Sequence, residues 1–407
     1  MDPSRPCLYA GARVTSGASV LVLNMEQDED QRAAGRTPLL TAFDTFSGIG
    51  GNALAFRRFS TVAAYCEKCP MATGALVSLM KRAVLDTAPV LPDITTVDVD
   101  KLPPFDFLTA SWPCQGNSAL GKRKAMNDPR SGLIKDVLRI LAVRKPAVVF
   151  LENVKEVVQR TNGSFQHVAQ ELQALEYDFA WMILKASQVG RPHVRARFFL
   201  VGLRRGSSGI DLDTLVEAAR LNKESELQRM NSLAEPDRML LTSNVLENRK
   251  VLGLFGNSVV PGCCACAFYI LINKIVEIRK AKPVASFGSE FNCPAGVSVD
   301  DTVYNSAFPR IPETTLKLVF DPKAFKTDKK ISSQSTSAPI ATPQEGEFWS
   351  TPRFGANHSC NYLTERSIRD LATQVRFERS TPDSQREGSI NPQWVQWLMG
   401  FPLQYIC

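Results

Sequence analysis

A cysteine and a glutamate in this chain have settings suited to covalent chemistry. Cys114 follows Pro113 in the run Ser-Trp-Pro-Cys-Gln-Gly, and the basic residues Lys122–Lys124 come shortly after it. A reactive cysteine needs exposure and a positive potential that favours its thiolate. Glu152 ends an apolar run, where a partly buried carboxyl group suits proton transfer. A packed cysteine and a helix-capping acid are the structural alternatives.

Two arginines and the distribution of charge point to an anionic partner. Arg195 and Arg197 open an apolar run, and strand geometry predicts that both side chains lie on one face. Arginines on one strand face suit a phosphate or a base edge. The net charge is +7, and residues 185–205 hold six basic and no acidic residues. Such local basic stretches are typical of nucleic-acid binding, with solvated surface charges as the alternative.

A glycine-rich turn offers a nucleotide site. Gly48-x-Gly50-x-x-Ala53 follows an apolar run, and Glu67 stands 19 residues after Gly48. This fits a relaxed dinucleotide fingerprint in which the acid binds ribose hydroxyls. A nicotinamide dehydrogenase, an adenosyl-cofactor enzyme and a plain α/β turn all fit this pattern alone.

These residues need a scaffold, and the hydrophobic pattern predicts one. Short apolar runs predict buried strands, whereas apolar residues at helical spacing predict helices between them. The alternation indicates an open α/β sheet, whose ligands bind beyond the carboxyl ends of the strands. The strands are expected at 39–44, 61–66, 105–110, 147–151, 181–186, 197–203 and 316–320, and helices at 51–59, 129–144, 211–229 and 261–278.

Composition narrows the class further. The chain has 407 residues, 44% of them hydrophobic, which is enough for two domains or one large domain with an appendage. It has no run of 18 apolar residues, so we expect no membrane-spanning helix. Residues 1–36 lack a signal-peptide core and are expected to form a disordered leader. Ten cysteines in such a chain indicate a reducing, intracellular compartment. The cysteine pairs at 66/69 and 263/266 are too far apart in sequence for a zinc ribbon, so we expect no metal.

Taken in order, the motifs resemble those of the DNA cytosine-5 methyltransferases over roughly residues 39–280. The similar segments are Asp44-Thr-Phe-Ser-Gly-Ile-Gly-Gly51, Tyr65-Cys-Glu-Lys68, Asp93-Ile94, Pro113-Cys-Gln115, Asp128-Pro-Arg-x-x-Leu133, Glu152-Asn-Val154, Pro192-His-Val-Arg-Ala-Arg197 and Gly256-Asn-Ser-Val-x-Pro261. The resemblance implies a class I S-adenosylmethionine-dependent methyltransferase fold, a Rossmann-like mixed sheet with a smaller C-terminal target-recognition region. It also implies methyl transfer to carbon 5 of cytosine in double-stranded DNA.

The resemblance assigns a role to each matching position. It implies that Cys114 adds to ring carbon 6 of a flipped cytosine, that Glu152 protonates ring nitrogen 3, that Arg197 orients the base and that Arg195 lies nearer the phosphates. The implied S-adenosylmethionine-binding residues are Asp44, Phe46, Ser47, Gly48, Gly50, Gly51, Glu67, Lys68, Asp93, Ile94, Pro113, Asn257, Ser258 and Val259. The implied DNA-binding residues are Gln115, Ser118, Lys122, Arg123 and Lys124.

The chain departs from the family pattern in two places. His193 stands where the arginine strand normally has glutamine, and Gly400-Phe-Pro402 lies after the Gly256 turn instead of before it, as in phage and viral members. We therefore expect a catalytic domain at 37–282, a linker at 283–347, and a region at 348–407 that takes part in target recognition. Residues 283–407 are expected to fold back over the cleft, and the protein to act as a monomer.

Two other functions remain open at this point. A transfer RNA methyltransferase on the same scaffold would carry a Cys-Phe-Thr signature, which this sequence lacks. A non-catalytic DNA-binding relative would not need Cys114, Glu152 and Arg197 together.

Overall fold

The catalytic part of the chain is built on one seven-stranded sheet. The computed structural model describes residues 38–113, 131–158, 164–207, 209–237, 239–240, 245–281 and 389–406. The strand order is β3-β2-β1-β4-β5-β7-β6. The strands are β1 (Leu40–Thr45), β2 (Ser60–Cys66), β3 (Val90–Leu91), β4 (Phe107–Ser111), β5 (Val148–Val154), β6 (Tyr177–Lys185) and β7 (Ala196–Arg204).

The sheet is mixed, as the sequence predicts. Strands β1 to β5 pair in parallel, and β7 runs antiparallel to both β5 and β6. All the parallel strands therefore end at one edge, with β1 and β4 adjacent at the point where the chain changes direction. This mixed sheet confirms the class I methyltransferase fold. The predicted strand at 316–320 lies outside the described residues.

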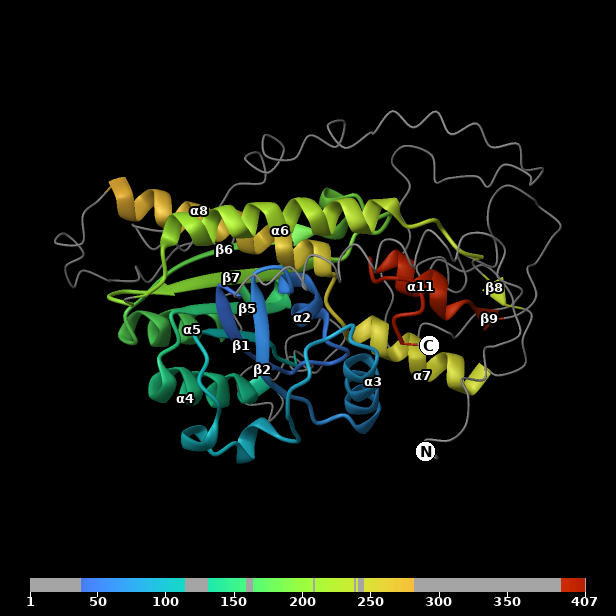
Figure 1. The fold of residues 1–407 in the computed structure, drawn as a ribbon, viewed down its shortest axis with the longest axis horizontal. Helices are drawn as coiled ribbons and strands as arrows, with labels where there is room; N and C mark the ends of the chain where they lie inside the picture. Colours follow the sequence, from blue (N-terminus) through green and yellow to red (C-terminus); the bar gives the residue numbers. More distant parts are fainter. Residues whose placement is uncertain are drawn as a thin grey trace.

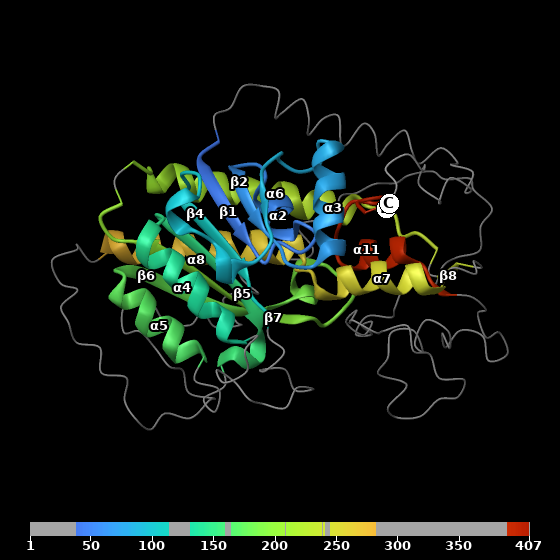
Figure 2. The same ribbon diagram turned by 90° about the horizontal axis from the view of Figure 1, so that it is seen from below.

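Helices cover both faces of the sheet (Figures 1 and 2). Helices α4 (Ile134–Arg144) and α5 (Ser164–Ala174) pack on one face. The other face carries helices drawn mainly from the two ends of the described chain, namely α2 (Gly51–Phe56), α3 (Pro70–Lys81), α6 (Leu212–Ser232) and α8 (Pro261–Ala281). The sheet is thus the middle layer of three.

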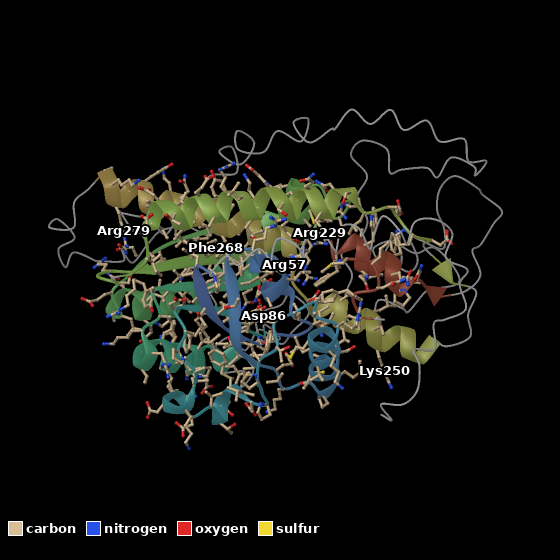
Figure 3. All side chains as sticks on the ribbon, viewed as in Figure 1. Arg57, Asp86, Arg229, Lys250, Phe268 and Arg279 are labelled. Carbon is tan, nitrogen blue, oxygen red and sulfur yellow. The ribbon has the colours of Figure 1, made fainter. Side chains whose placement is uncertain are left out.

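Helix α8 supplies the centre of the larger core. Phe268 points from α8 toward the sheet (Figure 3), and its ring centroid lies 5.3 Å from that of Phe56 and 5.5 Å from that of Phe107. The stretch Lys250–Ala281 is long and apolar enough to cross a membrane by length and composition, but 83% of its most apolar window is buried inside the fold. Burial against the sheet accounts for its hydrophobicity.

The C-terminal residues belong to this same core. Strand β9 (Ser389–Ile390) pairs with β8 (Met239–Leu240), and α11 (Pro392–Leu398) packs beside α7 (Val245–Asn257), as Figure 2 shows. Residues Trp394, Leu398, Phe401 and Tyr405 join the hydrophobic cluster that contains α2 and α8. The buried side chains of residues 389–406 therefore pack in the same hydrophobic core as those helices.

Candidate active site

The acidic residues predicted for the site meet at the carboxyl edge of the sheet. Asp44 is the next-to-last residue of β1, Glu67 directly follows β2, and Glu152 lies near the end of β5. Ser111, the last residue of β4, is the register partner of Glu152. Chain segments far apart in sequence are brought together here because parallel strands end on the same side.

The glycine turn between β1 and α2 has a backbone that few residues tolerate. Phe46, Gly48 and Gly50 have φ of 53°, 55° and 80°, a left-handed conformation that glycine adopts freely and that strains a residue with a Cβ, such as Phe46. A Cβ added at Gly48 would meet nothing within 4 Å, so space is open beside it. Glu67 Oε2 accepts a hydrogen bond from the Gly48 N–H at 2.7 Å. The turn and the predicted ribose-binding acid are therefore held together.

A second group of predicted cofactor residues lies beside β2. The Lys68 ammonium donates to Asp93 Oδ2 at 2.6 Å, which lowers the pKa of Asp93. The other Asp93 oxygen accepts from the Thr95 N–H at 3.0 Å and caps the short 3-10 helix Ile94–Thr96. Ile94 is buried and its carbonyl accepts from Arg139, so its side chain serves the core.

Asp44 lies inside the protein beneath the glycine turn. Its side chain is 1% exposed and accepts from Thr109 Oγ1 at 2.5 Å and from Asn52 Nδ2 at 3.3 Å. Burial raises the pKa of Asp44 from 3.8 to about 6, because desolvation disfavours the charged carboxylate. Asp44 Oδ2 and Asn52 Oδ1 are both buried without a hydrogen-bond partner.

Glu152 is a buried carboxyl group with one cationic partner. It is 7% exposed, and its Oε1 lies 3.3 Å from Arg197 Nε. Burial raises the pKa of Glu152, and the charges of Arg197 and Arg195 together with a hydrogen bond from Ser111 oppose that rise. A carboxyl group whose raised pKa is opposed by a neighbouring cation suits proton transfer, because its two protonation states respond to changes in its surroundings.

The nucleophile loop begins where Asn153 fixes the chain. Asn153 Nδ2 donates to the Trp112 carbonyl at 3.2 Å, and Asn153 Oδ1 accepts from the Val154 N–H at 2.8 Å. The first of these bonds fastens the residue after β4 to the end of β5, two residues before Cys114. Pro113 is half-buried. The other predicted residues of this loop lie outside the described residues: Cys114, Gln115, Ser118, Lys122, Arg123 and Lys124.

Arg195 is a buried arginine whose side chain bonds to backbone carbonyls. Its side chain is 5% exposed and donates to the carbonyls of Gly256 at 2.9 Å and Ser258 at 2.5 Å. Its guanidinium is turned inward onto the Gly256–Pro261 turn, and the DNA-phosphate contact that the resemblance implies for it stays a prediction. Arg197, within β7, is the arginine of the pair that reaches Glu152.

The Gly256–Pro261 turn packs against the back of the glycine turn. A Cβ on Gly51 would lie 2.5 Å from Val259 Cγ2, which explains why glycine is required there. Ser258 Oγ donates to the Phe255 carbonyl at 2.8 Å, whereas Asn257 is exposed. Val259 and Ser258 are buried, and thus support the turn from the protein side.

His193 is buried beside these arginines. Desolvation, with Arg195 and Arg191 nearby, lowers the pKa of His193 to about 3, so the ring is neutral. Its Nδ1 accepts from the Arg195 N–H at 3.4 Å. The histidine that replaces glutamine in this motif therefore holds backbone and does not carry charge.

Sequence reasoning missed the polar residues under the site. Asn52 Nδ2 donates both to Asp44 and, at 3.1 Å, to Ser111 Oγ. The only signal was a polar residue at the start of an apolar helix, directly after Gly50-Gly51. Within the described ranges no group of three His, Cys, Asp or Glu side chains is placed to hold a metal ion, and Cys263, Cys264 and Cys266 are buried in α8.

Comparison with known proteins decides the family. The sequence model of the C-5 cytosine-specific DNA methylases matches residues 40–261, more than half of the chain. The chain belongs to the C-5 cytosine-specific DNA methylases. Like other members of this family, it transfers a methyl group from S-adenosylmethionine to carbon 5 of cytosine in DNA, through a covalent cysteine adduct and base flipping.

Similarity to individual methylases extends over different lengths. The type II methyltransferase M.CviJI of Paramecium bursaria Chlorella virus IL3A is 26% identical over 381 residues, 89% of this chain and 96% of that protein. M.NgoBV of Neisseria gonorrhoeae is 32% identical over 182 residues, 42% of this chain and 43% of its own length. The crystal structure of the S. pombe Dnmt2 methyltransferase covers 51% of this chain and 66% of its own, with 22% identity and a TM-score of 0.37.

Proposed function

We propose that Cys114, Glu152 and Arg197 carry the reaction of this DNA cytosine methyltransferase. The observation that supports this most directly is the pairing of Glu152 Oε1 with Arg197 Nε at 3.3 Å, beside the end of β4 that leads into Cys114. Asn153 ties that strand end to the strand carrying Glu152. One carboxyl group, one guanidinium and the start of the cysteine loop thus share one corner of the sheet.

The reaction assigned to these residues begins with addition of a thiolate to the cytosine ring. The Cys114 thiolate forms a bond to ring carbon 6 while Glu152 donates its proton to ring nitrogen 3, and the electron pair moves to carbon 5. Carbon 5 takes a methyl group, and a base then removes the carbon-5 proton. The electron pair of that bond re-forms the double bond between carbons 5 and 6, the Cys114 thiolate leaves carbon 6, and the proton on ring nitrogen 3 returns to Glu152. General acid assistance of this kind contributes about 10²–10⁴-fold. Flipping the base out of the duplex costs about 3 kcal/mol of lost stacking.

Glu152 can serve as the proton donor because of its surroundings. Burial favours its neutral form, whereas Arg197 stabilises the carboxylate that remains after the proton leaves. The two opposing influences bring the donor and its conjugate base closer in free energy. Arg197, half-buried at the start of β7, is also placed to orient the flipped base.

S-adenosylmethionine supplies a methyl group on a positively charged sulfur. The residues present fit such a cofactor, because the space beside Gly48 is open and Glu67 lies against the same turn. We assign its binding to the glycine turn from Phe46 to Gly51, to Glu67, and to the Asp93–Lys68 pair. Asp44, Ile94, Ser258 and Val259 would act on it through the backbone they support, because all four are buried.

The DNA partner is assigned as double-stranded, bound by a single copy of the protein. Gln115, Ser118 and the basic residues Lys122–Lys124 would contact its backbone, since Lys and Arg supply most of the affinity for DNA. We assign target recognition to residues 283–388. This stretch is joined to the catalytic core at both ends, by α8 and by β9, so the catalytic domain comprises residues 37–282 together with 389–406.

Bisulfite sequencing of a plasmid from cells expressing the protein tests this function. The wild-type protein should leave 5-methylcytosine in one sequence context, and Cys114→Ser should leave none while still binding duplex DNA. Cys69→Ser is the matched control, because Cys69 is an exposed free cysteine outside the Pro113-Cys114-Gln115 motif. Methylation by Cys114→Ser at the wild-type level would overturn the assignment. An unmethylated plasmid together with labelled transfer RNA would point to the RNA-modifying alternative.

A further inference from the structure

The C-terminal residues reach across the molecule to the glycine turn. The Tyr405 hydroxyl donates to the Ile49 carbonyl at 2.9 Å and approaches the Gly50 carbonyl at 3.4 Å. Its side chain is 1% exposed, and burial raises the pKa of the phenol, so the hydroxyl remains a donor at every physiological pH. Tyr405 and Ile49 are 356 positions apart in the sequence.

Tyr405 is itself held in place from several sides. Its ring packs on Phe401 with centroids 4.9 Å apart, and Phe401 in turn packs on Phe255 at 5.4 Å. Arg82, at the end of α3, donates to the carbonyls of Gln404 and Tyr405 at 2.9 Å and 3.1 Å. The hydroxyl is thus presented by a rigid support.

The turn that receives this hydrogen bond holds three residues in the left-handed conformation, namely Phe46, Gly48 and Gly50. Gly50 has φ of 80°, and a Cβ placed there would lie 3.3 Å from the Tyr405 hydroxyl. The Gly50 carbonyl also accepts the first hydrogen bond of α2, from the Leu54 N–H at 2.9 Å. A donor at Ile49 and Gly50 therefore stabilises the backbone where the turn becomes helix.

We propose that Tyr405 is a positioning residue for the cofactor: its hydroxyl holds the Ile49–Gly50 backbone in the conformation that receives S-adenosylmethionine. The segment around Gly400-Phe401-Pro402, which follows the Gly256 turn in this sequence, thereby supports the backbone of the cofactor turn through Tyr405. This inference rests on the proposed assignment of the glycine turn to cofactor binding. It gives residues 399–406 a role in cofactor affinity rather than in reading the DNA sequence.

The test is Tyr405→Phe, which keeps the ring and removes only the hydroxyl. Its Kd for S-adenosylmethionine, measured by calorimetry on the full chain, should rise about three- to tenfold, the range expected when one net hydrogen bond is lost. The KM for S-adenosylmethionine should rise in parallel. The kcat at saturating cofactor and the KM for DNA should remain those of the wild-type protein.

Tyr177→Phe is the matched control. The Tyr177 hydroxyl is also buried and also donates to a backbone carbonyl, that of Pro146 at 2.5 Å, but it lies at the start of β6 on the opposite edge of the sheet. It should lower the melting temperature to a similar extent and leave the Kd for S-adenosylmethionine unchanged.

Three outcomes overturn the inference. An unchanged Kd in Tyr405→Phe would show that the hydroxyl only stabilises the fold, and an equal rise in Tyr177→Phe would show a general loss of stability. A rise in the KM for DNA alone would place the segment in target recognition. Failure of the underlying assignment is distinguished by Glu67→Gln: if that variant binds S-adenosylmethionine as the wild type does, the glycine turn is not the cofactor site.

Discussion

Replacing Asp44 by asparagine should stabilise this protein at neutral pH. Burial raises the pKa of Asp44 from 3.8 in the unfolded chain to about 6 in the fold. A carboxyl group with a raised folded pKa favours the native state below pH 3.8, and that contribution is lost as the pH rises through 6. The difference of about 2 pKa units corresponds to roughly 3 kcal/mol above pH 7.

Asparagine carries no charge, so it removes the desolvation cost of the buried carboxylate and can still make the local hydrogen bonds. Its Oδ1 can still accept from Thr109, and its new N–H₂ can donate to Asn52 Oδ1, which has no partner in the described structure. We expect Asp44→Asn to unfold with a free energy about 3 kcal/mol above that of the wild type at pH 7.5, and with only about half of that gain at pH 5. The gain and its pH dependence share one cause, the desolvated carboxylate.

Urea unfolding at pH 5, 6, 7 and 7.5 measures this directly. Asp98→Asn is the control, because Asp98 is exposed and Lys101 lowers its pKa below 3.8, so its loss should reduce stability by the same amount at all four pH values. A gain in Asp44→Asn that is the same at pH 5 and pH 7.5 would refute the reasoning. So would a loss of stability at pH 7.5, which would mean that the ionised carboxylate is the form the fold needs.

Two further predictions concern the residues around Glu152. Ser111→Ala removes a hydrogen-bond donor to the ionised Glu152, so the pKa of Glu152 should rise further. The alkaline limb of the kcat/KM profile should then move to higher pH, with kcat reduced about tenfold. The control Ser60→Ala loses a buried hydroxyl far from the site and should leave both unchanged, whereas an unmoved limb in Ser111→Ala would contradict this role. His193→Gln should keep the wild-type pH–rate profile, because the lowered pKa of about 3 keeps His193 neutral in the fold. Below pH 6 the variant should be more stable than the wild type, because the histidine of the wild-type protein gains a proton only when the chain unfolds. Circular dichroism melts at pH 5.5 and 7.5 measure this, and they would show the opposite if His193 were charged in the fold.

The sequence predicts the strands of the sheet well, because their signal is local. Five apolar runs match β1, β2, β4, β5 and β7 to within a few residues. The short strand β3 and helix α3 were not predicted, since two residues of strand carry no periodicity and α3 lacks a polar N-cap, having Cys69 before Pro70. Element type follows from periodicity, whereas short edge elements depend on their neighbours.

The arginine pair shows where local reasoning ends. Strand period correctly places Arg197 at the start of β7, but Arg195 precedes the strand and turns inward to the carbonyls of Gly256 and Ser258, 61 and 63 positions away. Nothing near Arg195 in the sequence distinguishes it from a residue facing DNA. The partner that decides its role is supplied by the tertiary fold.

By itself the sequence determined which residues end up at the carboxyl edge of the sheet. Asp44, Glu67 and Glu152 each follow or end an apolar run, and parallel pairing then brings the strand ends together. Only the tertiary structure decided how those residues are tuned. The burial that raises the pKa of Asp44, the Arg197 guanidinium beside Glu152 and the Tyr405 hydroxyl on the glycine turn all come from residues distant in the chain. Desolvation and long-range hydrogen bonds depend on packing, which no local pattern specifies.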